Sequence, residues 1–194
     1  MIRRIWAFIV FATLSHTWLL AIEKNETISP NTTSPTIGML FDAGIPNHKF
    51  DREAYGVSMF FKKRLRQPTI NHYWGVNVGY MRYKDDIKTR NDVSLTFGFG
   101  FISPPFYEPR IPITLFCGFD IGGIHKMQDD YYIDGDFHKG FNKLDGVLGF
   151  SSGFTIKITK KINFDWQMKI RFPFESNADR MFDAGLGMGL SYSL

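Results

Sequence analysis

The stretch Ile162–Phe172, INFDWQMKIRF, separates two kinds of residue by alternate positions. Every second residue from Ile162 is apolar, in the order Ile, Phe, Trp, Met, Ile, Phe, and the positions between them are Asn, Asp, Gln, Lys and Arg. Successive side chains of a β-strand point to opposite faces of the sheet. We therefore predict a strand with one apolar, aromatic face and one charged face, and the fold depends on where each face goes.

The same alternation recurs along the rest of the chain. Seven further segments show it: 36–44, 54–62, 73–81, 92–101, 111–122, 144–156 and 184–194. Strands of ordinary soluble domains are about five to six residues long, whereas a tilted strand that crosses a membrane needs about 9–11. Eight long segments in series therefore favour membrane-spanning strands.

The composition of the two faces indicates which one meets lipid. Positions on the polar face are mostly Gly and Ser with a few charges, and this suits the narrow interior of an eight-stranded barrel. A water-exposed face would have no reason to prefer Gly, which weakens strands. Aromatic residues near the expected strand ends would form interface girdles: Tyr55, Trp74, Tyr80, Phe101 and Tyr192. An alternative is a soluble, lipocalin-like secreted carrier, in which the apolar face would point inward.

Bulk composition excludes several classes of protein. The chain has 194 residues, 20 Phe, 18 Gly and a net charge of +4, which is too weak and too scattered to indicate a nucleic-acid partner. Its single cysteine, Cys117, excludes an intrachain disulfide and a multi-cysteine metal site. Mean hydropathy is −0.16, which does not fit an all-apolar helical membrane protein.

The N-terminal residues predict export. Arg3 and Arg4 precede an apolar run, as in a secretory signal peptide, and we place cleavage after Ala21; an uncleaved anchor is the alternative. Residues 22–35 are polar and contain two prolines, and we predict a disordered leader. The predicted organisation is a signal peptide (1–21), a leader (22–35) and a barrel (36–194).

The C-terminal segment LGMGLSYSL carries a family resemblance. It is similar to the assembly signal of bacterial outer-membrane barrels, with alternating apolar residues, an aromatic residue third from the end and a terminal apolar residue. The matching residues are Leu186, Met188, Leu190, Tyr192 and Leu194, and the departure is Leu194, where the family more often has Phe. Residues 36–194 resemble the small eight-stranded barrels of the OmpA transmembrane domain, OmpX, OmpW and opacity types.

This resemblance implies an all-β, eight-stranded antiparallel up-and-down transmembrane β-barrel. It also implies the outer membrane of a Gram-negative bacterium as the location. The implied partners are outer-membrane lipid, lipopolysaccharide and the barrel assembly machinery. A spanning sheet must satisfy every backbone polar group internally, so the eighth strand must pair with the first.

Charged residues on the polar face are the first candidate site. We predict a charge network in the lumen formed by Asp120, Asp145, Asp165, Gln167, Lys169 and Arg171. An isolated buried charge is costly, so these groups should pair and plug a narrow lumen. A gated, porin-like pore lining is the alternative.

Polar connectors at one end of the barrel are the second candidate. The segments 45–53, 82–91, 123–143 and 173–183 are long and charged, and the connectors expected at the other end are 62–72, 102–110 and 159–161. Long loops on one rim and short turns on the other are typical of outer-membrane barrels. We predict that the long loops bind an extracellular ligand or a host surface.

The longest connector raises the question of a metal site. It contains His125, Asp129, Asp130, Asp134, Asp136 and His138. Oxygen ligands of this kind can hold Ca²⁺, but the segment lacks the order of an EF-hand loop. We therefore favour a solvated loop with Asp-Gly turn chemistry, and we predict no metal and no cofactor.

An enzyme that modifies lipid A is the competing function. Deacylases of the PagL type carry His and Ser two residues apart, and no such pattern occurs after residue 21. His48, His72, His125 and His138 all fall in loops or at strand ends. We predict a non-enzymatic role, structural or in surface interaction, with the deacylase as the alternative.

Overall fold

The computed structural model describes residues 34–45, 53–65, 71–84, 86–103, 112–174 and 183–194. The predicted signal peptide and all but two residues of the predicted leader lie outside this set, so both stay predictions. Within the described residues, no helix is long and apolar enough to cross a membrane.

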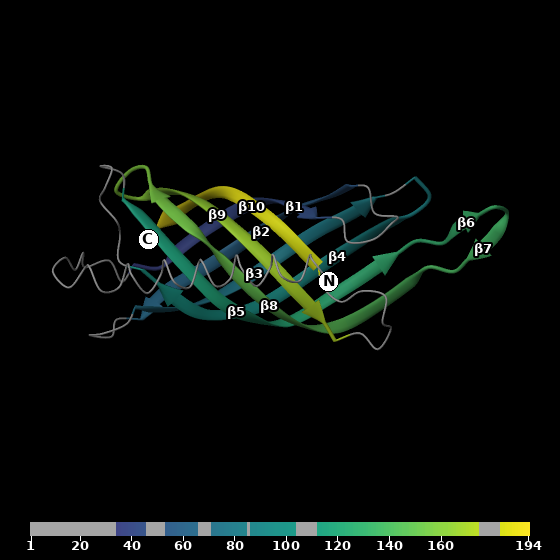
Figure 1. Ribbon diagram of the computed structural model, residues 1–194, viewed down its shortest axis with the longest axis horizontal. Helices are drawn as coiled ribbons and strands as arrows, with labels where there is room; N and C mark the ends of the chain where they lie inside the picture. Colours follow the sequence, from purple (N-terminus) through teal and green to yellow (C-terminus); the bar gives the residue numbers. More distant parts are fainter. Residues whose placement is uncertain (1–33, 46–52, 66–70, 85, 104–111, 175–182) are drawn as a thin grey trace, which may run out of the picture.

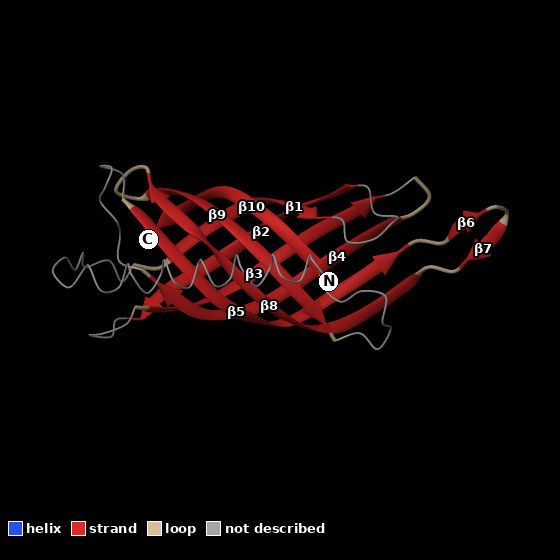
Figure 2. Ribbon diagram, in the orientation of Figure 1, coloured by secondary structure: helices blue, strands red, loops and turns tan. Residues whose placement is uncertain are grey.

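Eight long strands build one closed barrel (Figures 1 and 2). They are β1 (Thr36–Ile45), β2 (Glu53–Leu65), β3 (His72–Lys84), β4 (Thr89–Ile102), β5 (Ile113–Gln128), β8 (Phe141–Lys157), β9 (Ile162–Pro173) and β10 (Asp183–Ser193). Each strand pairs antiparallel with its neighbour in sequence, and β1 pairs with β10 from Thr36↔Ser193 to Ile45↔Ala184. Closure leaves the barrel without an edge strand. The predicted eight-stranded antiparallel up-and-down barrel is confirmed.

The two ends of the barrel differ. β1 begins and β10 ends at the end that also carries the turn at residues 158–161, and we call this end the turn side. At the opposite end, the hairpin side, a two-stranded extension formed by β6 (Tyr131–Ile133) and β7 (Asp136–His138) projects beyond the barrel wall (Figure 1).

Several strands are longer than the sequence predicts. The connector predicted at 82–91 is strand as far as Lys84 and again from Thr89. The connector predicted at 123–143 is strand except at 129–130, 134–135 and 139–140. The reason is continuous cross-strand pairing, because β5 pairs with β8 as far as Gln128↔Phe141. A connector that can complete backbone hydrogen bonds as a hairpin has no need to leave the sheet. Most of the connectors 45–53 and 173–183 lies outside the described residues.

Apolar faces point away from the barrel axis. Phe97 of β4 and Met188 of β10 are 59% and 55% exposed. Trp166, on the apolar face of β9, stacks on Phe154 of β8. The alternate residues Asp165 and Gln167 are only 3% and 4% exposed. This orientation is the reverse of the one that a lipocalin-like carrier would need, and it is the orientation of a barrel whose surface meets acyl chains.

The aromatic residues predicted for the girdles lie on the outward face near the strand ends. Tyr55 and Tyr80 lie toward the hairpin side, and Trp74, Phe101 and Tyr192 lie toward the turn side. Four of the five are at least 36% exposed and Phe101 is half-buried. Aromatic rings in two such bands suit the two membrane interfaces.

The interior is filled rather than open. Buried large side chains alternate with the polar ones: Leu40, Phe60, Tyr73, Phe116, Ile124 and Val147. Small residues opposite them make this packing possible, because a Cβ at Gly38 would lie 2.5 Å from the Phe60 ring. The lumen is therefore a packed core that contains both apolar and ionised groups.

Candidate functional site

A lysine at the centre of the lumen joins three strands. Lys169 of β9 places its Nζ 3.2 Å from Asp42 Oδ1 of β1, and it donates a hydrogen bond of 2.9 Å to Ser58 Oγ of β2. The missing side chain at Gly187 makes room for the acid, since a Cβ there would meet Asp42 Oδ1 at 2.5 Å. The pair therefore joins β9 to β1 on the inner side of β10, which lies between these two strands.

The other predicted lumen residues of β5 and β9 lie inside but do not pair with one another. Thr155 Oγ1 donates a 2.6 Å hydrogen bond to Asp165 Oδ1. Asp120 lies against Gly98, and with Gln167 and Arg171 it lines a cavity of about 30 Å³. Among the described residues, no ion pair joins two members of the predicted set.

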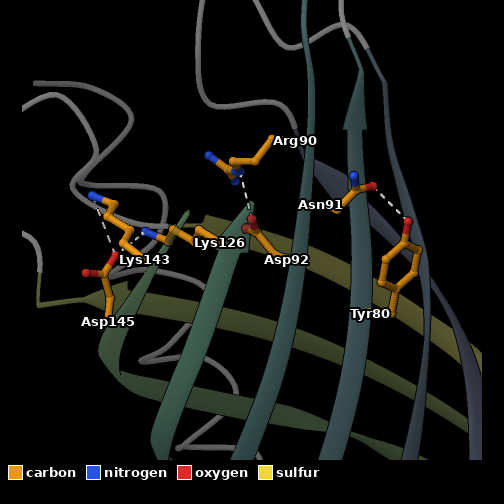
Figure 3. Close-up of polar contacts among 7 residues, drawn as sticks. All are labelled: Tyr80, Arg90, Asn91, Asp92, Lys126, Lys143 and Asp145. Atoms are coloured by element: carbon orange, nitrogen blue, oxygen red, sulfur yellow. Dashed lines mark hydrogen bonds and ion pairs between the residues drawn. The ribbon is translucent and has the colours of Figure 1, made fainter. Parts of the chain in front are cut away.

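A second group of charges lies near the hairpin side (Figure 3). Lys126 Nζ of β5 and Lys143 Nζ of β8 lie 3.2 and 3.8 Å from Asp145 Oδ2. Arg90 Nε lies 2.9 Å from Asp92 Oδ1, and the Arg90 guanidinium also stacks over the Tyr83 ring at 4.0 Å. Lys126, Arg90 and Asp92 are all less than 5% exposed, so these charges form part of the packed interior.

Sequence reasoning missed most of the partners in these pairs. It included Asp145 and Lys169 but not Asp42, Arg90 or Lys126. Arg90 and Lys126 lie in segments predicted to be loops, although the inward alternation continues through both positions. Extending each strand for as long as the alternation lasts would have placed these two cations in the lumen.

Cavities lie at several levels of the described interior. One of about 330 Å³ lies at the turn side and is lined by residues of all eight barrel strands. Two others of about 30 Å³ lie deeper; Phe60, Lys62 and Tyr73 separate the large cavity from the first, and Met81 and Tyr83 line the second. Each small cavity is about the volume of one water molecule in the liquid.

The turn of the β6–β7 hairpin is formed by Asp134 and Gly135, the Asp-Gly pair for which the sequence predicts a turn. Asp134 has φ 51° and Gly135 has φ 90°, the pair of positive angles that a type I′ two-residue turn requires. Ile133 pairs with Asp136 on either side of this turn. Asp130 Oδ1 accepts a 2.7 Å hydrogen bond from the Gly140 backbone N–H at the base of the hairpin.

Aromatic side chains occupy both faces of the hairpin. Tyr132 and Phe137 form a cross-strand pair with ring centroids 5.4 Å apart, and they are 66% and 56% exposed. On the other face, Tyr131 stacks on His138 at 5.1 Å with an interplanar angle of 9°. Exposed loops usually carry polar side chains, so two large exposed aromatic side chains on this extension mark a candidate interaction surface.

The described histidines point to no catalytic pair. His72 packs on Phe99 and Phe101, His125 hydrogen-bonds with Asn142, and His138 stacks on Tyr131. None of these three hydrogen-bonds to a serine, and His48 lies outside the described residues. In the same part of the chain, no three His, Cys, Asp or Glu side chains come together as metal ligands, the loop acids included.

Residues of the predicted assembly signal line up along β10. Leu186, Met188, Leu190 and Tyr192 all point outward and are 36–56% exposed. Leu194 follows the strand, is 62% exposed and donates its backbone N–H to Pro35 O at 2.9 Å. Their role in assembly stays a prediction.

Comparison with solved structures identifies the same fold. The chain is similar to the crystal structure of Neisserial surface protein A (NspA), with a TM-score of 0.51, 14% identity and coverage of 82% of this chain and 96% of that one. It is also similar to the attachment invasion locus protein Ail of Yersinia pestis, with a TM-score of 0.50, 14% identity and coverage of 83% and 97%.

A third similar structure is the backbone structure of Ail in a phospholipid bilayer nanodisc, with a TM-score of 0.50, 13% identity and coverage of 84% and 99%. No family model matches the sequence, and no curated protein matches it. Together with the closed ring of strands, these likenesses show that the chain has the fold of the small eight-stranded outer-membrane β-barrels.

Proposed function

We propose that the protein is an integral outer-membrane barrel of a Gram-negative bacterium, with a plugged lumen, that acts in surface interaction through its β6–β7 hairpin. The apolar outward belt supports a location in lipid, because a soluble protein rarely exposes so large a contiguous apolar area. Lipid and lipopolysaccharide would contact this belt, and the barrel assembly machinery would recognise β10.

Membrane fractionation tests the location. The protein should be recovered with the lipopolysaccharide-rich membrane, and in detergent it should migrate differently on a gel before and after boiling, because the closed barrel stays folded in the unboiled sample. Recovery in the aqueous fraction without detergent, together with unchanged migration, would contradict the location.

The packed interior supports the proposal of a plugged lumen. Phe60, Tyr73 and Phe116 are each 3% exposed and close the barrel below the turn-side cavity. Purified protein in a planar bilayer should therefore show no ion-conducting steps. Stable conductance at neutral pH would instead support the pore alternative.

The observation that supports surface interaction is the pair of exposed rings, Tyr132 and Phe137. They belong to β6 and β7, which project from the barrel (Figure 1). Aromatic residues dominate the binding energy of protein interfaces, where they serve as rigid anchors. The acids Asp129, Asp130, Asp134 and Asp136 flank the pair, and with Lys139 as the one lysine between residues 129 and 140 the hairpin has a net charge of −3. This charge favours a basic protein surface as the partner over an anionic polysaccharide.

A peptide-display selection against the barrel in lipid nanodiscs tests this role. Selected peptides should be rich in Lys and Arg with apolar residues between them, and they should lose binding to the double variant Tyr132→Ser/Phe137→Ser. The control is Ile87→Ser, because Ile87 is 45% exposed in the β3–β4 connector but outside the hairpin. Binders that are acidic, or that bind the double variant equally well, would contradict the proposal.

A further inference from the structure

The turn-side cavity differs in chemistry from the rest of the interior. It is open to one end of the barrel and has a volume of about 330 Å³, which corresponds to the space of about eleven water molecules at ~30 Å³ each. Its floor is aromatic, from Phe60, Tyr73 and Phe116. A space of this size could hold a small organic molecule rather than a single ion.

Positive charge dominates the wall of this cavity. Five cationic side chains line it: Lys62, Arg64, Lys157, Lys160 and Lys161. Asp165 is the one carboxylate side chain among the described lining residues, and the Thr155 hydroxyl already hydrogen-bonds to it. Lys161 also lies over the outward-facing Tyr192 ring at 5.4 Å. In the central lumen, by contrast, the Lys169 ammonium forms an ion pair with Asp42.

Lys62 lies against aromatic rings at the floor, and the carboxylates of Asp165 and Asp120 act on it only at a distance, without forming an ion pair. Its Nζ lies 3.5 Å from the ring centroid of Phe116, 4.8 Å from that of Phe60 and 5.6 Å from that of Tyr73. No hydrogen bond or ion pair joins it to any described residue. Ring faces stabilise a cation but supply no hydrogen-bond acceptor lone pair, so the Lys62 ammonium can still donate to a bound anion.

We propose that this turn-side cavity binds a small multivalent anion bearing phosphate or carboxylate groups. Lys62 would bind it at the floor, and Arg64, from the same inward face of β2, would add a planar fork suited to either group. Several like charges around a mouth with low-dielectric walls create a potential that concentrates anions. The proposal goes beyond the hairpin function, because the site lies at the opposite end of the barrel.

Isothermal titration calorimetry on the detergent-solubilised protein tests the site, with inorganic pyrophosphate and citrate as probes. At least one probe should bind. Tighter binding of pyrophosphate would indicate a site for phosphate groups, and tighter binding of citrate would indicate a site for carboxylate groups. The substitutions Lys62→Gln and Arg64→Gln should each weaken binding tenfold or more. The measurement depends on neither a membrane nor the hairpin. A negative result would therefore contradict the anion site without bearing on the proposed surface interaction.

The matched control is Lys63→Gln. Lys63 follows Lys62 on β2, carries the same charge and points outward because alternate residues of a strand face opposite sides. This variant should bind within twofold of the unmodified protein. Gel migration before boiling checks that each barrel is folded, and Arg64→Gln keeps the test valid if Lys62→Gln fails to fold. Absence of binding by both probes, or an equal loss in the Lys62 and Lys63 variants, would overturn the proposal.

Discussion

The barrel wall and the β6–β7 hairpin are built from the same kind of strand pairing but under different constraints. Every strand of the wall pairs on both sides in a closed ring, whereas β6 and β7 pair only with each other in the described structure. Closure of the barrel fixes the pairing register of each strand, and the register determines whether each side chain points inward or outward. A two-stranded ribbon alone is marginally stable in water and depends on its turn and its cross-strand pairs.

This difference assigns separate roles to the two regions. The wall places ions inward and aromatic rings toward lipid, and a change on either face should lower the free energy of unfolding. The hairpin exposes aromatic side chains but is not part of the closed barrel wall. Changes in the hairpin should therefore affect binding and leave the barrel intact. Substitutions in each region can separate the two roles.

The largest loss of stability is expected from Lys169→Met. It removes the cation from Asp42, whose carboxylate then stays in the lumen without that partner, and breaking a buried pair costs about 3–5 kcal/mol. Reversible urea unfolding in lipid vesicles measures the change. The double variant Asp42→Asn/Lys169→Met should regain much of the loss, because no uncompensated charge remains. Equal losses in the single and double variants would show that the pair does not matter.

A charge on the lipid face should cost somewhat less. Phe97→Arg puts a guanidinium on the outward face of β4 near mid-barrel, and such a change at the bilayer midplane costs about 2–4 kcal/mol. The control, Leu65→Arg at the turn-side end of β2, should cost only about 0–1 kcal/mol because the arginine reaches the interface. The same unfolding assay compares them, and equal effects would contradict the orientation in the membrane.

The sequence predicted the wall well because alternation is a local signal. Each of the eight segments could be assigned a face without knowledge of its partners, as at Trp166 against Asp165. Phe116 and Val147 are apolar residues at positions where the alternation expects polar ones, and both are buried in the lumen. A small barrel tolerates such exceptions where glycine on a neighbouring strand leaves room.

The interior contacts could not be predicted in the same way. Which cation meets which acid depends on the stagger of strands around the ring, and this stagger brings Asp42 and Lys169 together across 127 positions of sequence. The turn-side cavity is also non-local, because all eight strands line it. The Asp134-Gly135 turn was predictable from its residues, but the paired strands on either side of it are too short to give a periodic signal.

A smaller effect is expected from Gly135→Val in the hairpin turn. A β-branched residue at φ 90° is strained, at a cost of about 1–2 kcal/mol that falls on the hairpin alone. Amide hydrogen exchange should quicken in Tyr131–Ile133 and Asp136–His138, while the unfolding free energy of the barrel stays constant. Asp136→Asn, beside the turn, serves as the control. A matching loss of barrel stability would show that the hairpin and the wall unfold as one unit.

The smallest effect on stability should come from Tyr132→Ser/Phe137→Ser. The cross-strand aromatic pair contributes about 0.2–1 kcal/mol to the local ribbon, and exposed substitutions outside special features change global stability by less than about 0.5 kcal/mol. Urea unfolding should therefore give the same midpoint as the unmodified barrel, while binding of the selected peptides is lost. Lost binding at unchanged stability would establish that the rings are exposed for a partner, because packing alone gives no reason to keep them at the tip. A lowered midpoint with binding retained would instead assign both rings to the structure of the barrel.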